Sequence, residues 1–120
     1  MSLLRNATIY KALEDGEYVG TLASFKEVAK TDKMSEHVEL NFELTELNNR
    51  PVTIYLFENN LGFTLQSLAQ AVDFEGDAVE LLKTAKGVPV QLVRKTKIVD
   101  DINNPGEEKK YYNWYINKLS

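Results

Sequence analysis

The stretch VELNFELTELNNRPVTIYLF, residues 38–57, decides the fold class of this chain. Its first half alternates strictly between apolar and polar side chains, which is the period-2 pattern of a strand with one buried face. Asn48, Asn49 and Pro51 then predict a tight turn. The residues that follow predict a second strand with its own apolar face. The stretch therefore predicts a β-hairpin and a mainly β domain.

Similar patterns outside this hairpin predict three more strands. Gly20 falls inside the first strand and predicts a bulge or bend there. In the last strand Tyr112 and Trp114 share a face with Ile116, so burial in the core is expected for both. A long loop over residues 98–110 is expected before that strand. The five expected strands cover residues 17–28, 38–45, 52–57, 88–97 and 111–118.

Between the third and fourth strands the period changes to that of helices. Apolar residues from Leu61 to Val72 follow helical spacing, with Thr64 as the expected N-cap. Asp77 is expected to cap a second short helix, which Gly87 ends. This order predicts a five-stranded OB-fold, a Greek-key barrel, with a helical insert between strands 3 and 4. A five-stranded α+β sandwich and an SH3-like barrel have the same element order and remain alternatives.

The composition is that of one small domain over residues 1–120, with 43% hydrophobic residues and three prolines. Residues 1–15 have no clear period and are expected to form an N-terminal arm or an extra element. The absence of cysteine excludes disulfides, thiolate metal sites and thiol nucleophiles. No stretch approaches the roughly 20 apolar residues of a membrane span, and no signal peptide is recognisable. A cytoplasmic location is therefore expected.

Motifs of enzymes and cofactor sites are missing from the sequence. The six glycines are isolated, which excludes the common phosphate-cradling loops. The single histidine, His37, has no serine in a nucleophile-elbow sequence to act with. The segments Glu36-His37-x-Glu39 and Asp100-Asp101 carry metal-binding side chains, but a solvated loop is the expectation for both. We expect no enzymatic activity, no cofactor and no metal.

The basic character of the chain lies in its last third. The net charge is −4, yet residues 88–120 carry 6 Lys and Arg against 4 Asp and Glu. Proteins that bind single-stranded nucleic acid combine aromatic rings, which stack on bases, with cations along the phosphates. The candidate binding residues are Tyr55, Phe57, Arg94, Lys95, Lys97, Lys109, Lys110, Tyr111, Trp114 and Tyr115, with Lys30 and Lys33 in the first hairpin loop.

Other features favour different interpretations. Glu39 and Glu43 lie on the polar face of the second strand, where they would repel phosphates. They either pair with neighbouring lysines or lie off the path of the DNA. Tyr111 and Tyr115 could instead mark a dimer interface. The basic run at residues 94–97 could protect a sheet edge. An OB-like adaptor that contacts proteins and no nucleic acid is the alternative function.

Four segments carry a resemblance that spans nearly the whole chain. They are LEDGEYV at residues 13–19, the hairpin at residues 38–57, LGFTLQSLAQAV at residues 61–72 and YYNWYINKL at residues 111–119. Together they resemble small single-stranded-DNA-binding proteins of bacteriophages, especially the lactococcal type. The resemblance implies an OB-fold that coats single strands during phage DNA replication and recombination in the infected bacterial cell. It also implies a strand-annealing recombinase as partner and self-association, with a dimer favoured.

Overall fold

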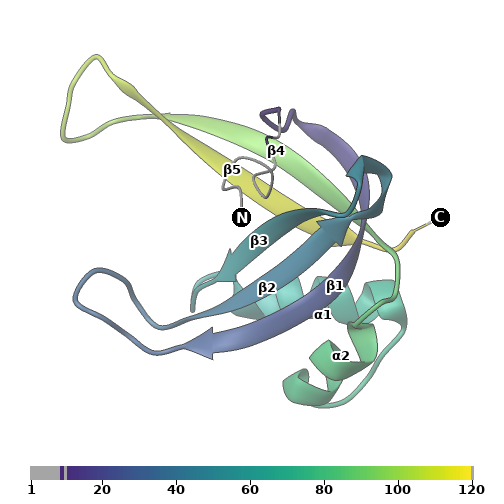
Figure 1. Cartoon of the computed structure of the whole chain (residues 1–120). Helices are drawn as coiled ribbons and strands as arrows, with labels where there is room; N and C mark the ends of the chain where they lie inside the picture. The colour runs from purple at the N-terminus through teal and green to yellow at the C-terminus, as the bar shows by residue number, and fades with distance from the viewer. Residues whose placement is uncertain (1–8, 10, 120) are drawn as a thin grey trace, which may run out of the picture.

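Five antiparallel strands form one sheet in the computed structural model, which describes residue 9 and residues 11–119 (Figure 1). The elements are β1 (Gly16–Val28), β2 (His37–Leu44), the 3-10 turn η1 (Thr45–Leu47), β3 (Arg50–Leu56), α1 (Leu61–Val72), α2 (Ala78–Ala85), β4 (Val90–Asp100) and β5 (Glu108–Asn117). The order across the sheet is β3-β2-β1-β4-β5. Within the described residues β3 and β5 are the two free edges, so the sheet is not closed.

The sheet is strongly curved because β1 changes partner along its length. It pairs with β4 up to Gly20 and with β2 from Gly20 onward. A Cβ atom at Gly20 would lie 2.6 Å from Cδ1 of Leu92 and 3.3 Å from the carbonyl oxygen of Glu43, so a side chain here would have to displace the buried Leu92 side chain. The register shift of β1 lies further on, between Leu22 and Ser24. Gly20 is thus the residue at which the pairing of β1 passes from β4 to β2, and the expected bulge lies between Leu22 and Ser24 instead.

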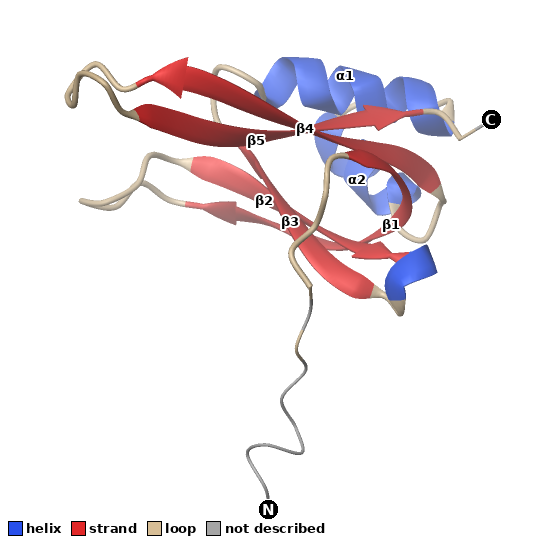
Figure 2. Cartoon of the chain, turned by 90° about the horizontal axis from the view of Figure 1, so that it is seen from above, coloured by secondary structure: helices blue, strands red, loops and turns tan. Residues whose placement is uncertain are grey.

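The hydrophobic core lies between the inner face of the sheet and the two helices. The alternation is confirmed from Leu40 to Leu44 in β2 and from Val52 to Leu56 in β3, where every second side chain is buried. Helix α1 packs against β5 and α2 approaches β1 (Figure 2). The largest fully buried side chains are Phe42, Leu22, Leu40, Leu44, Leu56, Leu68, Leu92 and Val90.

The helix boundaries agree only in part with the sequence pattern. Asp77 caps α2 as expected, because its side chain accepts a hydrogen bond of 3.0 Å from the backbone N–H of Glu80. The expected N-cap at Thr64 is wrong, since α1 begins after Asn60 and Thr64 is a buried residue within the helix. The Asn60 side chain instead accepts from the N–H of Phe57 and donates to the carbonyl of Tyr55. It thereby ties the end of β3 to the start of α1.

The expected long loop over residues 98–110 is also wrong. Pairing of β4 with β5 continues to Asp100 opposite Glu108, which leaves only residues 101–107 as the connection. Asp101 folds this tip, because its carboxylate accepts from the backbone N–H of Asn103 at 3.0 Å and from Nδ2 of Asn104 at 3.1 Å. It is buried, in contrast to the solvated position expected for it. Backbone hydrogen bonds between β4 and β5 keep the two ends of this segment in strands although their side chains are mostly polar.

Two long hairpins project on the same side of the molecule. The β1–β2 and β4–β5 connections extend in the same direction in both views, beyond the helices (Figures 1 and 2). Residues 1–8, 10 and 120 lie outside the described residues, so most of the expected N-terminal arm does too. Residues 11–14 have no regular secondary structure. None of the described helices has the length and hydropathy needed to cross a membrane.

Candidate nucleic-acid interface

A cleft of about 740 Å³ lies between the two free edges of the sheet, β3 and β5, and the start of α1. Of the one Trp, six Tyr and five Phe in the sequence, seven line this cleft. None of its lining residues is charged. We call it the aromatic cleft. Its lining residues are Thr53, Ile54, Tyr55, Phe57, Asn59, Asn60, Phe63, Thr64, Tyr111, Tyr112, Asn113, Trp114 and Tyr115.

Most rings of the aromatic cleft are open to solvent. The exposed fraction is 67% for Phe63, 55% for Tyr112, 48% for Tyr111, 45% for Tyr55 and 36% for Tyr115. A contiguous exposed aromatic surface of this kind marks a binding site more often than a scattered one does. Phe63 lies on helix α1, where the helical period alone gave no reason to assign it to a site.

Strand β5 contributes side chains of both faces to the cleft because it is an edge strand. Trp114 is half-buried and packs against Tyr18, with ring centroids 6.0 Å apart. Tyr112 was expected in the core with Trp114, but this is wrong. The Arg94 guanidinium covers its ring at 4.2 Å from the centroid, and the ring is otherwise exposed. The core ends at Ile116 and Trp114, because β4 and β5 extend past the helices.

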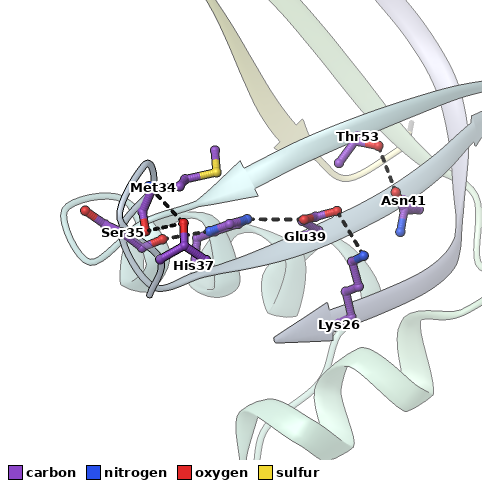
Figure 3. Close-up of polar contacts among 8 residues, drawn as sticks. Lys26, Met34, Ser35, His37, Glu39, Asn41 and Thr53 are labelled. Atoms are coloured by element: carbon purple, nitrogen blue, oxygen red, sulfur yellow. Dashed lines mark hydrogen bonds and ion pairs between the residues drawn. The ribbon is translucent and has the colours of Figure 1, made fainter. Parts of the chain in front are cut away.

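His37 supports the aromatic rings on the β3 side of the cleft. Its ring centroid lies 5.7 Å from that of Tyr55 and 5.2 Å from that of Phe57. Nδ1 donates to the carbonyl of Ser35 at 2.8 Å, and Nε2 pairs with Oε2 of Glu39 at 3.2 Å (Figure 3). With only 3% exposure, His37 is a buried positioning residue and not the solvated loop residue expected from the sequence.

Of the two glutamates on the polar face of β2, Glu39 is partly neutralised by its neighbours. Oε1 of Glu39 lies 3.8 Å from Nζ of Lys26 on β1, and the same carboxylate contacts His37 (Figure 3). Next along β2, Asn41 accepts a hydrogen bond of 2.8 Å from the Thr53 hydroxyl. Glu43 lies at the far end of the strand, near η1. Of the two explanations that the sequence left open, pairing with lysine therefore holds for Glu39.

Lysine and arginine side chains lie along β4 and β5, the two strands of the last hairpin. Nζ of Lys95 lies 5.5 Å from the ring centroid of Tyr115, and Lys97 is the register partner of Tyr111. Nζ of Lys109 lies 3.6 Å from the carboxylate of Asp101, so part of its charge is used at the hairpin tip. We call this group the basic margin, and it comprises Arg94, Lys95, Lys97, Lys109 and Lys110.

Lys30 and Lys33 are not brought into the aromatic cleft. Both are exposed in the β1–β2 loop. The end of that hairpin borders a second cleft of about 840 Å³, which shares Phe57 and Asn59 with the aromatic cleft. Three carboxylates line this second cleft, from Glu27, Glu36 and Glu58. Although larger, it has the wrong charge for phosphates, and we call it the acidic cleft.

The metal-binding patterns of the sequence do not assemble into a site. Among residues 9 and 11–119, no group of three or more His, Asp or Glu side chains is arranged to hold a metal ion. The carboxylate of Asp101 serves the loop that follows it, and hydrogen bonds from Asn104 chiefly hold its pKa below the ordinary value. Both Glu39 and His37 are engaged with each other.

Asp15 makes a dense polar cluster with β4, next to the aromatic cleft. Its carboxylate accepts from Nη1 of Arg94 at 2.9 Å, from the backbone N–H of Thr96 at 2.9 Å and from the Thr96 hydroxyl at 2.7 Å. The hydroxyl contact is the largest cause that lowers the pKa of Asp15, and Arg94 adds to it against an opposing effect of burial. The sequence gave no signal for this cluster, since 79 residues separate Asp15 from Arg94.

Two sequence comparisons with known proteins give no match for this chain. No protein-family model matches it, and no curated protein is similar enough in sequence to count as a match. The resemblance to phage single-stranded-DNA-binding proteins therefore stays a prediction.

Proposed function

We propose that this protein binds single-stranded DNA with little sequence preference, holding bases in the aromatic cleft and phosphates along the basic margin. The observation that carries the proposal is the gathering of seven aromatic residues in one uncharged cleft beside five cations of a single hairpin. Rings that stack on bases and cations that follow the backbone are the two requirements of such binding.

The chemistry of the cleft favours single strands over duplexes. Unpaired bases present flat faces to exposed rings, and each stacking contact contributes roughly 1–3 kcal/mol. Bases in a duplex are already stacked on one another, so they cannot use the cleft without unpairing. Every base has such a face, which makes stacking tolerant of sequence. The polar lining groups are the neutral side chains of Thr53, Asn59, Asn60, Thr64 and Asn113.

The charge distribution indicates the path of the bound DNA across the protein surface. The acidic cleft lies at the end of the aromatic cleft near Phe57, and its three carboxylates repel phosphates. The basic margin lies at the opposite side, along β4 and β5. The proposed path therefore follows β5 and its hairpin and avoids the β1–β2 loop, which leaves Lys30 and Lys33 outside it.

We further propose that the domain is an OB-fold. The order β3-β2-β1-β4-β5 is the strand order of that barrel opened between β3 and β5, and both helices fall between β3 and β4. Hairpins β1–β2 and β4–β5 correspond to the two loops that bind ligands in OB-folds. The proposed setting is phage DNA replication and recombination in the bacterial cytoplasm, as a self-associating protein beside a strand-annealing recombinase.

A gel-shift comparison tests the proposal. The protein is titrated against a labelled single-stranded oligonucleotide and against the duplex of the same sequence, in low salt. The proposal expects retention of the single strand at much lower protein concentration than the duplex. Equal retention of the two, or retention of neither, would reject it.

The acidic cleft favours a second candidate function, that of an OB-like adaptor for a basic protein segment. Its apolar floor of Val38, Leu56 and Leu61 lies beside the carboxylates of Glu27 and Glu36. In that case the gel shift fails while neutralisation of these two glutamates disrupts a protein complex. Loss of DNA retention on mutation of Tyr55 would instead exclude the adaptor as the sole function.

A further inference from the structure

Arg94 and Thr96 form a cradle of three hydrogen-bond donors on β4. Nη1 of Arg94, the backbone N–H of Thr96 and the Thr96 hydroxyl all point at the carboxylate of Asp15, at 2.7–2.9 Å. A guanidinium, a backbone N–H and a hydroxyl are also common partners of a phosphate in nucleic-acid complexes. The lowered pKa of Asp15 agrees with a position that stabilises negative charge.

We propose that this cradle is a phosphodiester-binding subsite, which the Asp15 carboxylate occupies in the free protein and a DNA phosphate occupies in the complex. The inference rests on the proposed function and adds a specific anion site and its internal competitor. Asp15 is then an antagonist of DNA binding, since removal of its charge frees the cradle.

The position of the cradle fits a strand whose bases enter the aromatic cleft. The guanidinium of Arg94 lies over the ring of Tyr112, at 4.2 Å from its centroid, and Tyr112 lines the cleft. Thr96 is the register partner of Tyr112 on β5. A base that stacks on the cleft rings near Tyr112 would therefore carry its phosphate toward the cradle.

Asp15 is placed so that it can be displaced. Its side chain is 48% exposed, whereas that of Arg94 is only 13% exposed. Asp15 precedes β1, and residues 11–14 before it form neither strand nor helix. Its departure would thus leave the β1–β4 pairing intact, because that pairing begins at Gly16 opposite Arg94.

The test is the affinity of Asp15→Asn for oligo-dT, measured by fluorescence anisotropy over a salt series. Asparagine keeps the size and one acceptor oxygen but removes the charge. We expect binding at least about threefold tighter than wild type with a similar salt slope, because the same number of phosphates is neutralised in both complexes. Glu75→Gln is the matched control, since it removes one negative charge from an exposed position between α1 and α2.

The Arg94→Gln substitution tests whether the tighter binding of Asp15→Asn comes from the freed cradle or only from the loss of one negative charge. In the double variant Asp15→Asn/Arg94→Gln the gain should vanish, because the cradle has lost its guanidinium. If Asp15→Asn binds more weakly than wild type, or no more tightly than Glu75→Gln, Asp15 is a structural anchor and the inference is overturned. Wild-type protein that fails to bind oligo-dT refutes the proposed function itself, so the two failures are distinguishable.

The backbone N–H of Thr96 gives a second readout that does not depend on affinity. Its amide resonance should shift on titration of wild-type protein with oligo-dT, as Asp15 leaves and a phosphate arrives. In Asp15→Asn the free and bound shifts should differ, but the bound shift should match that of wild type. An amide resonance that does not respond to saturating oligo-dT would overturn the proposal, even if a variant folds poorly.

Discussion

His37 lies behind Phe57 with the two ring centroids 5.2 Å apart, and this contact joins the start of β2 to the wall of the aromatic cleft. Its two ring nitrogens are held by Ser35 and Glu39, so the ring cannot turn away. Tyr55, which lies on β3 two residues before Phe57, packs on the same imidazole with the ring centroids 5.7 Å apart. One buried side chain thus sets the position of two rings that are proposed to stack on bases.

Replacement of His37 separates ring packing from hydrogen bonding. His37→Ala should lower the free energy of unfolding by about 1–3 kcal/mol, the usual cost of a buried truncation, and should weaken oligo-dT binding because Tyr55 and Phe57 lose their support. His37→Phe keeps a flat ring and should retain most of the binding. Urea unfolding and anisotropy measure the two effects. Equal loss of binding in both variants would show that the hydrogen bonds, and not the packing, position the rings.

Truncation of cleft aromatics should weaken binding without a matching loss of stability. Tyr55→Ala, Tyr115→Ala and Phe63→Ala remove rings that are at least 36% exposed, so the core is unaffected. Each should cost about 1–3 kcal/mol of binding free energy to oligo-dT. Tyr55→Phe is the control, since it keeps the ring and loses only the hydroxyl. Binding that survives all three alanine variants would place the DNA outside the aromatic cleft.

Two lysine pairs with the same charge test the path of the strand. Lys97→Ala/Lys110→Ala removes two cations of the basic margin, and Lys30→Ala/Lys33→Ala removes two from the β1–β2 loop. The first pair should reduce the salt slope by about 1.4, the value for two phosphates on a single strand. The second pair should leave the slope close to that of wild type. The reverse result would route the DNA over the acidic cleft.

Acid should weaken the fold through Asp15. Its pKa is lowered in the folded protein, so its contribution to stability is present above the unfolded value of about 3.9 and is lost as the pH falls through the folded value. The difference in unfolding free energy between wild type and Asp15→Asn should therefore be constant from pH 5 to 7, and it should shrink below about pH 4. Urea titrations across this range measure it, and a difference that grows in acid would contradict the assigned sign.

Local pattern was sufficient for the strands whose one face is buried, such as β2 and β3, because alternation follows directly from burial. It failed where a strand leaves the core. The ends of β4 and β5 have no buried face, so their polar residues resembled a loop although the backbone ladder continues. Tyr112 was misplaced for the same reason. The alternation of side chains along β5 placed Tyr112 on the same face as Ile116, but the hydrophobic core does not extend as far as Tyr112.

The candidate site was predicted in its parts but not in its assembly. Tyr55 and Tyr115 were predicted as binding residues on separate strands. Their meeting across the gap between β3 and β5 depends on the curvature of the whole sheet, which no short window contains. His37, Phe63 and Asp15 were missed because each acts through residues far away in sequence or on another element.

Trp114 provides the most direct test of the central claim, since it is the single tryptophan of the chain and it lines the aromatic cleft. Its fluorescence is followed while oligo-dT is added in low salt, and salt is then added to the complex. The account predicts saturable quenching, as a base approaches the indole, and recovery of the signal as salt releases the strand. A duplex of the same length should give little change. Unchanged Trp114 fluorescence with no binding by anisotropy would contradict the assignment of the aromatic cleft to single-stranded DNA.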